Sequence, residues 1–264
     1  MTAMETVALA VDERGVARLD MNRAEVFNAF DETMIAELAA SFDELGRRDD
    51  VRVVVLGARG KAYSAGADLQ WMKRQSANDE ATNRADARRF AEMMRAVAEC
   101  PKPTVARVQG SAFGGGVGLM AACDIVVVAE HARFAVSEAK FGILPAVIGP
   151  YVVNAVGVRQ ARRLALTATP IDAREALALG LAHRVVAADA LDAAVDAVLA
   201  ELLGNGPGAQ GEIKRLFAQL EVGPITAEVR ELTAATIARV RSTDEAREGF
   251  AAFLDKRRAS WSRA

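Results

Sequence analysis

The sequence is poor in the residues that build disulfide frameworks and metal sites. It contains two cysteines, Cys100 and Cys123, and two histidines, His131 and His183, in 264 residues. Two cysteines among small or apolar neighbours are typical of a reducing compartment rather than of a disulfide-rich secreted domain. The two histidines lie far apart and match no metal-ligand spacing, so we expect packing or surface roles for them and no metal centre.

An excess of positive charge and a long apolar run are also missing. Lysines and arginines number 33 and acidic residues 35, which gives a formal net charge of -2. This balance offers no field that would attract nucleic acid or an anionic membrane. No apolar stretch approaches the ~20 residues of a membrane span, and residues 1–10 carry no basic segment ahead of their short apolar run. We therefore expect a cytoplasmic protein that binds neither nucleic acid nor membrane.

The sequence is rich in apolar residues, at 52%, and its first half arranges them in alternating strand and helix patterns. Residues 7–11 and 16–21 alternate around a turn, which predicts a β-hairpin. Residues 28–45 show helical spacing, and residues 51–56 form a β-branched run typical of a strand buried on both faces. Residues 73–85 are polar, and we expect them to be mobile.

The same order then repeats and predicts an α/β fold with mostly parallel strands. A helix over residues 90–98 ends before a Pro-Lys-Pro sequence. Strands are expected at 104–108 and 125–128, with a helical segment at 119–122 between them. After residue 150 only residues 184–186 are expected as a strand.

The remaining chain is predicted to be helical, which suggests two parts: an α/β core over residues 1–200 and a helical region over residues 201–264. Apolar positions in the second part exceed what a lone helix pair can bury, so packing against another subunit is expected. Those positions are Val229, Leu232, Ile237, Phe250, Phe253 and Leu254. Helices are expected at 151–165, 172–179, 188–203, 209–220, 225–240 and 243–257.

Two glycine-rich loops are the candidate site. Residues 61–69 and 110–118 each follow a predicted strand, where ligands of α/β sheets gather. Small residues in the first loop let a substrate approach the backbone, and the glycines of the second leave N–H groups at the positive end of a helix. Together the loops could offer two donors to a developing oxyanion.

The alternatives for these loops are a purely structural turn or another class of enzyme site. A glycine-rich turn is often only a tight connection. Ser64 and Ser111 lack the G-x-S-x-G frame of a serine hydrolase. The run Gly114–Gly118 has no following lysine and serine or threonine, so it is no P-loop. It does not open the first βα turn, as a dinucleotide-binding fingerprint would.

The chain resembles the enoyl-CoA hydratase/isomerase (crotonase) superfamily along nearly its whole length. The resemblance implies a spiral of repeated ββα units, with a C-terminal helical region that assembles homotrimers or hexamers. The stretches that carry it are Leu19-Asp20-Met21-Asn22-Arg23-Ala24, Phe27-Asn28-Ala29-Phe30, Ala65-Gly66-Ala67-Asp68-Leu69, Pro101-Lys102-Pro103, Gly114-Gly115-Gly116, Cys123-Asp124-Ile125 and Ser137-Glu138-Ala139-Lys140-Phe141-Gly142-Ile143-Leu144-Pro145.

The resemblance also implies an acyl-CoA thioester as substrate, with no cofactor beyond the coenzyme A that the substrate carries. Its oxyanion hole would be formed by the N–H groups of Ala67 and Gly115, and Glu138 would transfer protons. Asp68 is expected to bond its own turn, and Lys256 would approach the nucleotide phosphates, often of a neighbouring subunit, or simply end a solvated helix. The implied substrate and coenzyme A contacts are Arg23, Lys61, Ala65, Gly66, Asp68, Leu69, Gly114, Ala146 and Lys256.

One departure concerns a second glutamate. Typical hydratases of the superfamily place one two residues beyond the glycine triplet, where this chain has Gly118. A single carboxyl with a raised pKa could serve both proton transfers of a hydration. It would equally serve an isomerase, which takes a proton from C2 and returns it at C4.

A second departure is the stretch Pro145-Ala146-Val147-Ile148-Gly149, where hydratases of straight-chain substrates are richer in glycine. It resembles bacterial hydratases of branched glutaconyl-CoA thioesters in leucine and acyclic-terpene catabolism. Ala146 and Val147 would then line the acyl pocket, and Lys73 or Arg74 could meet a distal carboxylate, unless they are only exposed charges.

Three functions are left open by the sequence. The first is an enoyl-CoA hydratase, for 3-methylglutaconyl-CoA or a relative, and the second a Δ3,Δ2-enoyl-CoA isomerase with Glu138 as sole acid and base. The third is a non-catalytic acyl-CoA-binding or RNA-binding member. Against RNA binding, the arginines between residues 84 and 95 are interrupted by Asp86 and Glu92.

Overall fold

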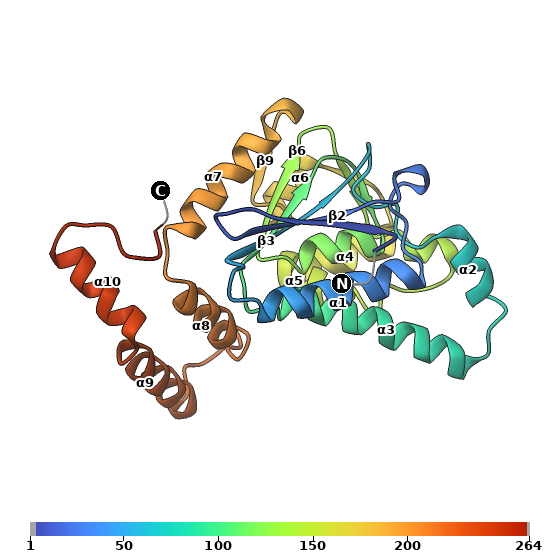
Figure 1. Cartoon of the computed structure of the whole chain (residues 1–264). Coiled ribbons are helices and arrows are strands. Elements are labelled where there is room, and N and C mark those ends of the chain that lie inside the picture. The colour runs from blue at the N-terminus through green and yellow to red at the C-terminus, as the bar shows by residue number, and fades with distance from the viewer. Residues whose placement is uncertain (1–3, 263–264) are drawn as a thin grey trace.

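The central feature of the structure, a computed structural model that describes residues 4–262, is a six-stranded sheet (Figure 1). Its strands are β1 (Val7–Val11), β2 (Val16–Met21), β3 (Val53–Ala58), β4 (Thr104–Val108), β6 (Ile125–Ala129) and β9 (Arg184–Val186). They lie in the order β1-β2-β3-β4-β6-β9. The β1–β2 pair is antiparallel, as the predicted hairpin requires, and the other pairs are parallel.

The alternation of side chains along β3 divides the core into two layers. Val53 and Val55 pack with α7 (Leu191–Leu203) on one face of the sheet. Val54 and Leu56 point to the other face and belong to the larger cluster. All six residues of β3 are buried, which confirms the strand expected from its continuous apolar run.

The larger cluster is covered by helices from the first two thirds of the chain. They are α1 (Glu32–Arg47), α3 (Glu80–Ala98), α4 (Gly115–Ala121), α5 (Gly149–Thr167) and α6 (Ala173–Leu179). α1 begins later than expected because Phe27 and Asn28 have positive φ angles of 55° and 53°. Asp31 then caps the helix by accepting a hydrogen bond from the Met34 N–H at 2.9 Å.

The polar segment over residues 73–85, which was expected to be mobile, contains parts of two helices. α2 (Leu69–Gln75) enters this segment and α3 begins at Glu80. Asp79 caps α3 by accepting from the Thr82 N–H at 2.8 Å. The polar composition of the segment belongs to a solvated helix face with its own cap, which is why composition alone suggested a loop.

Three short strands form a second sheet that the sequence did not predict. They are β5 (Ala112–Phe113), β7 (Arg133–Ala135) and β8 (Ile171–Asp172), in the order β5-β7-β8. Runs of two or three residues are too short to show a period. Three single turns of 3-10 helix also occur among residues 4–262: η1 (Ala24–Val26), η2 (Glu138–Phe141) and η3 (Ala188–Ala190).

The C-terminal helices extend away from the sheet, at the left of Figure 1. They are α8 (Pro207–Phe217), α9 (Ala227–Arg241) and α10 (Asp244–Leu254). Lys214 anchors α8, since its Nζ lies 2.6 Å from Asp124 Oδ2. α7 crosses the division expected at 200/201 and packs on the sheet, so the outlying part begins with α8.

Together these elements give the α/β fold with mostly parallel strands that the sequence predicted, followed by a helical C-terminal region. Within residues 4–262, the structure has no helix that is both long enough and apolar enough to span a membrane.

Candidate active site

The two predicted loops lie side by side and are joined by backbone hydrogen bonds. The Ser64 carbonyl accepts from the Phe113 N–H at 2.9 Å, and the Ser111 carbonyl accepts from the Tyr63 N–H at 3.0 Å. Gly66 needs to be glycine because a Cβ there would lie 2.9 Å from the Phe113 carbonyl oxygen, at a φ of +89°. The fold therefore brings the loops 61–69 and 110–118 together, as expected from the sequence.

The N–H of Ala67 is held outward by its neighbours. Phe30 pairs with Ala67 as an isolated parallel bridge. The Phe30 N–H donates to the Gly66 carbonyl at 2.7 Å, and its carbonyl accepts from the Asp68 N–H at 2.8 Å. In a parallel bridge the residue between the two hydrogen-bonded ones, here Ala67, directs its own N–H away from the partner residue. Among residues 4–262 the Ala67 N–H has no acceptor.

The N–H of Gly115 is free for a different reason, because it is the first residue of α4. The preceding carbonyl, of Gly114, accepts from the Val117 and Gly118 N–H groups at 2.9 and 3.3 Å. No acceptor for the Gly115 N–H lies in the described part of the chain. A Cβ on Gly115 would lie 2.9 Å from Phe30 Cε2 and 3.1 Å from Phe90 Cζ, so glycine lets α4 begin against these rings.

Glu138 lies against the start of α4. A Cβ built on Gly114 would be 3.2 Å from Glu138 Oε1, which places the carboxyl at the backbone of the glycine triplet. The other oxygen, Oε2, is buried and has no hydrogen-bond partner among the described residues. Burial raises the pKa of the carboxyl, and backbone N–H groups of Glu138 and Ser137 oppose the shift.

The position of the absent second glutamate is filled by a hydrophobic side chain. A Cβ on Gly118 would lie 2.3 Å from Ile148 Cγ2 and 2.4 Å from Ile148 Cβ. Ile148 is 1% exposed. A side chain at residue 118 therefore has no room unless Ile148 moves.

Arg23 and Asp68 form a clamp behind the first loop. Asp68 caps α2 by accepting from the Gln70 N–H at 2.8 Å, and its other oxygen lies 3.1 Å from Arg23 Nη2. Arg23 also lies 3.0 Å from Asp31 Oδ2 and donates to the Ala29 carbonyl at 2.7 Å. The pKa of Asp68 is lowered by the backbone donors and Arg23, which outweigh its burial.

The other expected coenzyme A contacts lie on the exposed side of this loop. Ala65 and Leu69 are solvent-exposed, Leu69 at 77%. Lys61 Nζ lies 5.4 Å from the centroid of the exposed Phe27 ring, within cation–π range. A flat apolar surface with a neighbouring cation suits a nucleotide base and its phosphates.

Two of the expected contacts stand apart from the clamp. Ala146 is exposed in the loop between η2 and α5, and its N–H donates to the Leu144 carbonyl at 2.8 Å. Lys256 follows α10 at a positive φ of 54°. α10 and α2 lie at opposite ends of the molecule in Figure 1, so Lys256 is not brought to the loops of its own chain.

Asn28 is a residue of the site whose role the sequence did not predict. It is fully buried, and its side-chain amide donates to the carbonyls of Arg59 and Ala62 at 2.8 and 2.9 Å. Its own carbonyl accepts from the Ser64 hydroxyl at 2.8 Å. An asparagine before a helix, able to adopt positive φ, was the available signal.

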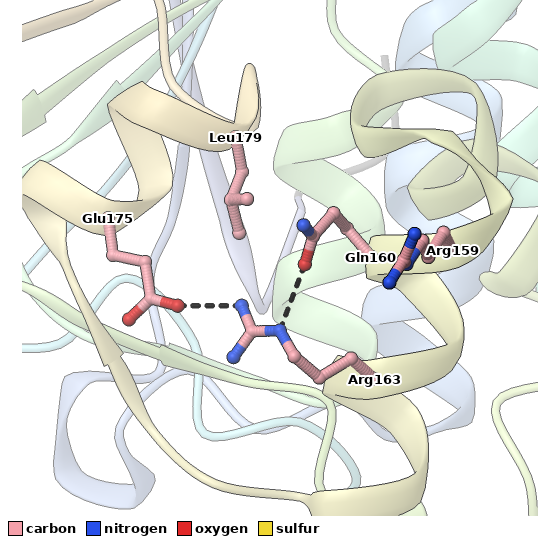
Figure 2. Close-up of a pocket in the computed structure, with 5 residues that line it drawn as sticks. All are labelled: Arg159, Gln160, Arg163, Glu175 and Leu179. Carbon is pink, nitrogen blue, oxygen red and sulfur yellow. Dashed lines mark hydrogen bonds and ion pairs between the residues drawn. The ribbon is translucent and has the colours of Figure 1, made fainter.

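Two hollows of the surface contain none of these groups. One, of about 490 Å³, is lined by Arg159, Gln160, Arg163, Glu175 and Leu179. Figure 2 shows Arg163 bound between Gln160 and Glu175 and Arg159 turned away from them. The second, about 190 Å³, is apolar and is lined mainly by residues along the length of α5. The chemistry of the chain gathers at the loops and not in these hollows.

Comparison with known proteins covers nearly the whole chain. A sequence model of the enoyl-CoA hydratase/isomerase family matches residues 12–264. A putative enoyl-CoA hydratase of Thermus thermophilus is 36% identical over 247 residues, 94% of this chain and 97% of that protein. A trans-2-decenoyl-[acyl-carrier-protein] isomerase of Streptococcus mutans is 27% identical over 95% of each chain.

The similarity extends to solved structures. The crystal structure of an enoyl-CoA hydratase from Shewanella pealeana is 41% identical, with a TM-score of 0.94, over 98% of this chain and 96% of that one. A match of this length in sequence and in fold includes both loops and Glu138. The chain therefore belongs to the enoyl-CoA hydratase/isomerase, or crotonase, family.

Proposed function

We propose that the chain is an enoyl-CoA hydratase, which adds water across the 2,3 double bond of an enoyl-CoA thioester. The observation that carries the proposal is the Glu138 carboxyl beside the glycine triplet, with one buried oxygen that has no hydrogen-bond partner among residues 4–262. The two unpaired N–H groups, of Ala67 and Gly115, supply a hole for the thioester oxygen. No cofactor is needed beyond the coenzyme A of the substrate.

In the proposed reaction Glu138 takes a proton from water as the water oxygen bonds to C3. The π electrons move to the thioester oxygen, and the Ala67 and Gly115 N–H groups hold the resulting enolate. Glu138, now neutral, then gives the proton to C2 while the enolate returns to the thioester. A carboxyl whose pKa is raised by burial suits both steps, because its charged form is a stronger base and its neutral form persists closer to neutral pH.

Isomerisation between 3-enoyl and 2-enoyl thioesters is the second candidate. The packing of Ile148 against Gly118 favours it, since one carboxyl is enough to move a proton from C2 to C4. One similar protein carries an isomerase name, whereas the Thermus and Shewanella proteins carry hydratase names. On the names of these similar proteins, we propose hydration ahead of isomerisation.

For the acyl group we propose a branched chain, with 3-methylglutaconyl-CoA as the first substrate to try. Its support is the apolar stretch that ends in Ile148, where a branch would find apolar contact. A cation for the distal carboxylate is more readily supplied by Lys73 than by Arg74. Arg74 already pairs with Glu32 at 2.7 Å, and Lys73 has no ion-pair partner among residues 4–262.

A non-catalytic or RNA-binding role has weaker support. Three of the four arginines of α3 are paired with acidic side chains of the same chain: Arg84 with Glu80, Arg89 with Asp86, and Arg95 with Glu92 and Glu99. Pairing of this kind removes the positive surface on which RNA binding depends.

The proposal includes assembly as a homotrimer or hexamer. Phe250, Phe253 and Leu254 of α10 are 56%, 83% and 76% exposed, and such a surface is usually covered in solution. Because Lys256 follows these residues, a neighbouring copy seated on them would lie beside this Lys256 and would bring its own substrate site toward it. The phosphates of coenzyme A would be the group it meets.

Mass spectrometry of products separates the candidates. The purified chain is offered straight-chain 2-enoyl-CoA, 3-enoyl-CoA and 3-methylglutaconyl-CoA in separate reactions. Hydration adds the mass of one water, and isomerisation changes chromatographic retention at constant mass. Unchanged starting material in all three reactions, with enoyl-CoA also failing to bind, would overturn the proposal.

A further inference from the structure

Two unusual features of the sequence, thirty residues apart, meet at one point in the fold. Gly118 lies inside α4, and Ile148 is the residue that precedes α5. The three heavy atoms nearest to a Cβ on Gly118 all belong to Ile148. The isoleucine therefore occupies the volume into which any side chain at residue 118 would project, and the two positions form a matched pair.

This pair lies one helical turn from Glu138. The Gly118 N–H donates to the Gly114 carbonyl at 3.3 Å, and Gly114 is the residue whose Cβ would meet Glu138 Oε1. Successive turns of an α-helix lie about 5.4 Å apart along its axis. Glu138 and Ile148 thus pack against adjacent turns of α4, and the same loop, from η2 to α5, carries both.

The wall that Ile148 provides is apolar. The Ile148 side chain has no hydrogen-bonding atom, and it belongs to the main hydrophobic cluster. The Oε2 atom of Glu138 finds no partner in the described part of the chain. A side chain at residue 118 that could hold or activate water beside Glu138 is excluded, because Ile148 leaves no room for it.

We propose that Ile148 is the positioning residue that limits this cleft to one proton-transferring group. It fills the space of a residue-118 side chain and makes the wall beside Glu138 apolar. With residue 118 closed off in this way, Glu138 is the carboxyl that exchanges protons with a water or acyl carbon that reacts there. The inference rests on the proposed function for its catalytic consequence, but the packing it describes can be tested without any substrate.

The packing is tested with a thermal double-mutant cycle. Alanine is ordinarily favoured over glycine inside a helix, yet Gly118→Ala should lower the Tm by roughly 5 °C or more because its Cβ meets Ile148. In an Ile148→Gly background the same change should no longer lower the Tm. A Leu164→Ala background, elsewhere on α5, is the control and should not rescue it.

The double-mutant cycle tests the packing of Gly118 against Ile148 even if the Gly118→Ala variant alone does not fold. Recovery of a folded protein by adding Ile148→Gly, measured against the Ile148→Gly single variant, supports the matched pair. An equal loss of Tm in the native and Ile148→Gly backgrounds overturns it, since the cost would then not come from Ile148.

The chemical consequence is tested with two isosteric substitutions. Ile148→Thr and Ile148→Val have nearly the same shape and keep the Cγ2 atom, but only threonine adds a hydroxyl. A hydroxyl, or a water bound to it, can donate to the Glu138 carboxylate and favour its charged form. In Ile148→Thr the acidic limb of kcat/KM should therefore move down by about 0.5 pH unit or more, relative to Ile148→Val.

Equal acidic limbs in the two variants would overturn the proposal. The carboxyl-carbon NMR titration of Glu138 in the same variants gives this comparison without turnover. If the native chain processes no enoyl-CoA, the proposed function fails. The NMR titration and the Tm cycle then still decide whether Ile148 sets the surroundings of Glu138.

Discussion

At the scale of single residues, Glu138 is a carboxyl whose surroundings favour its neutral form. One oxygen lies at the start of α4, and the other is buried without a partner among residues 4–262. Burial raises its pKa. The property that suits Glu138 to move protons is therefore one that costs folding stability when the group is charged.

Glu138→Gln should lower kcat by roughly 10²-fold or more, because glutamine keeps the shape of the side chain but carries no transferable proton. The rate is measured with whichever enoyl-CoA the native chain converts. Glu130→Gln, an exposed glutamate after β6, is the matched control and should retain the native rate. A near-native kcat for Glu138→Gln would remove Glu138 from the mechanism.

The same substitution, Glu138→Gln, should lower activity but should gain stability over the native chain as pH rises. The pKa of Glu138 is raised on folding, above an unfolded value of about 4.3. Its stability contribution is then fully present below that value and is lost as pH rises through the folded pKa. Glutamine has no such loss, so the free energy of unfolding of Glu138→Gln, relative to native, should increase from pH 4 to pH 8.

Urea unfolding at the two pH values measures this difference. A relative stability that stays constant, or that moves in favour of the native chain as pH rises, would mean that folding does not raise the pKa of Glu138.

At the scale of elements, the junction between β5 and α4 positions the site. Gly114 has φ 49° and ψ -120°, outside the helical regions. This conformation turns the chain so that its carbonyl closes the first turn of α4 while the Gly115 N–H stays free. The same turn leaves space for Glu138, which a Cβ would meet at 3.2 Å. One backbone conformation thus serves the hydrogen-bond donor and the carboxyl together.

Gly114→Ala should therefore reduce kcat/KM at least about tenfold, since the donor and the carboxyl are both displaced by strain and contact. Gly157→Ala, inside α5, is the control: its φ is +73°, and a Cβ there would meet nothing within 4 Å. It carries a backbone cost of roughly 1–3 kcal/mol but lies outside the turn that carries Glu138. Steady-state kinetics alongside Tm would distinguish them, and equal kinetic losses would contradict the role given to Gly114.

At the scale of the whole molecule, the C-terminal helices are joined to the core by a few polar contacts. Lys214 donates to the Lys102 carbonyl at 3.1 Å as well as pairing with Asp124. Arg52, at the sheet, donates to the Trp261 carbonyl at 3.0 Å. Glu245 of α10 accepts from the Gly208 N–H at the start of α8. These contacts fix where the apolar face of α10 is presented.

Lys214→Met should lower the free energy of unfolding by about 1 kcal/mol, because the pair is largely shielded and Asp124 keeps its bonds from Thr104. Arg215→Met on the same helix removes a pair whose arginine is 65% exposed, and should cost less than about 0.5 kcal/mol. Urea unfolding gives both values. Equal effects would show that Lys214 anchors nothing.

Assembly is tested by mass measurement in solution. Phe253→Asp should convert a trimer or hexamer to a smaller species, since a carboxylate cannot be buried in an apolar contact without large cost. Leu166→Asp, at a comparably exposed leucine of α5, is the control. Light scattering on size-exclusion peaks gives the mass of each. A native chain that is already monomeric would contradict the proposed assembly.

The strands and most helices could be predicted from the sequence because their signals are local. The continuous apolar run of β3 and the alternation of β1 and β2 appear as expected. The helix expected over residues 90–98 starts too late, because α3 begins at Glu80. The capping residue Asp79 was a local signal for that start, but the polar composition around it suggested a loop. The short strands β5, β7 and β8 could not be predicted, since they exist only through pairing between distant segments.

By itself the sequence determined the family, the two glycine-rich loops and the presence of one glutamate, Glu138, where typical hydratases of the family have two. These follow from residue types at fixed spacings along one chain. Only the tertiary structure decided that Ala67 and Gly115 have unpaired N–H groups and that Ile148 fills the space beside Gly118. The physical reason is that hydrogen-bond partners and side-chain volume are settled by residues far apart in sequence, which no local pattern records.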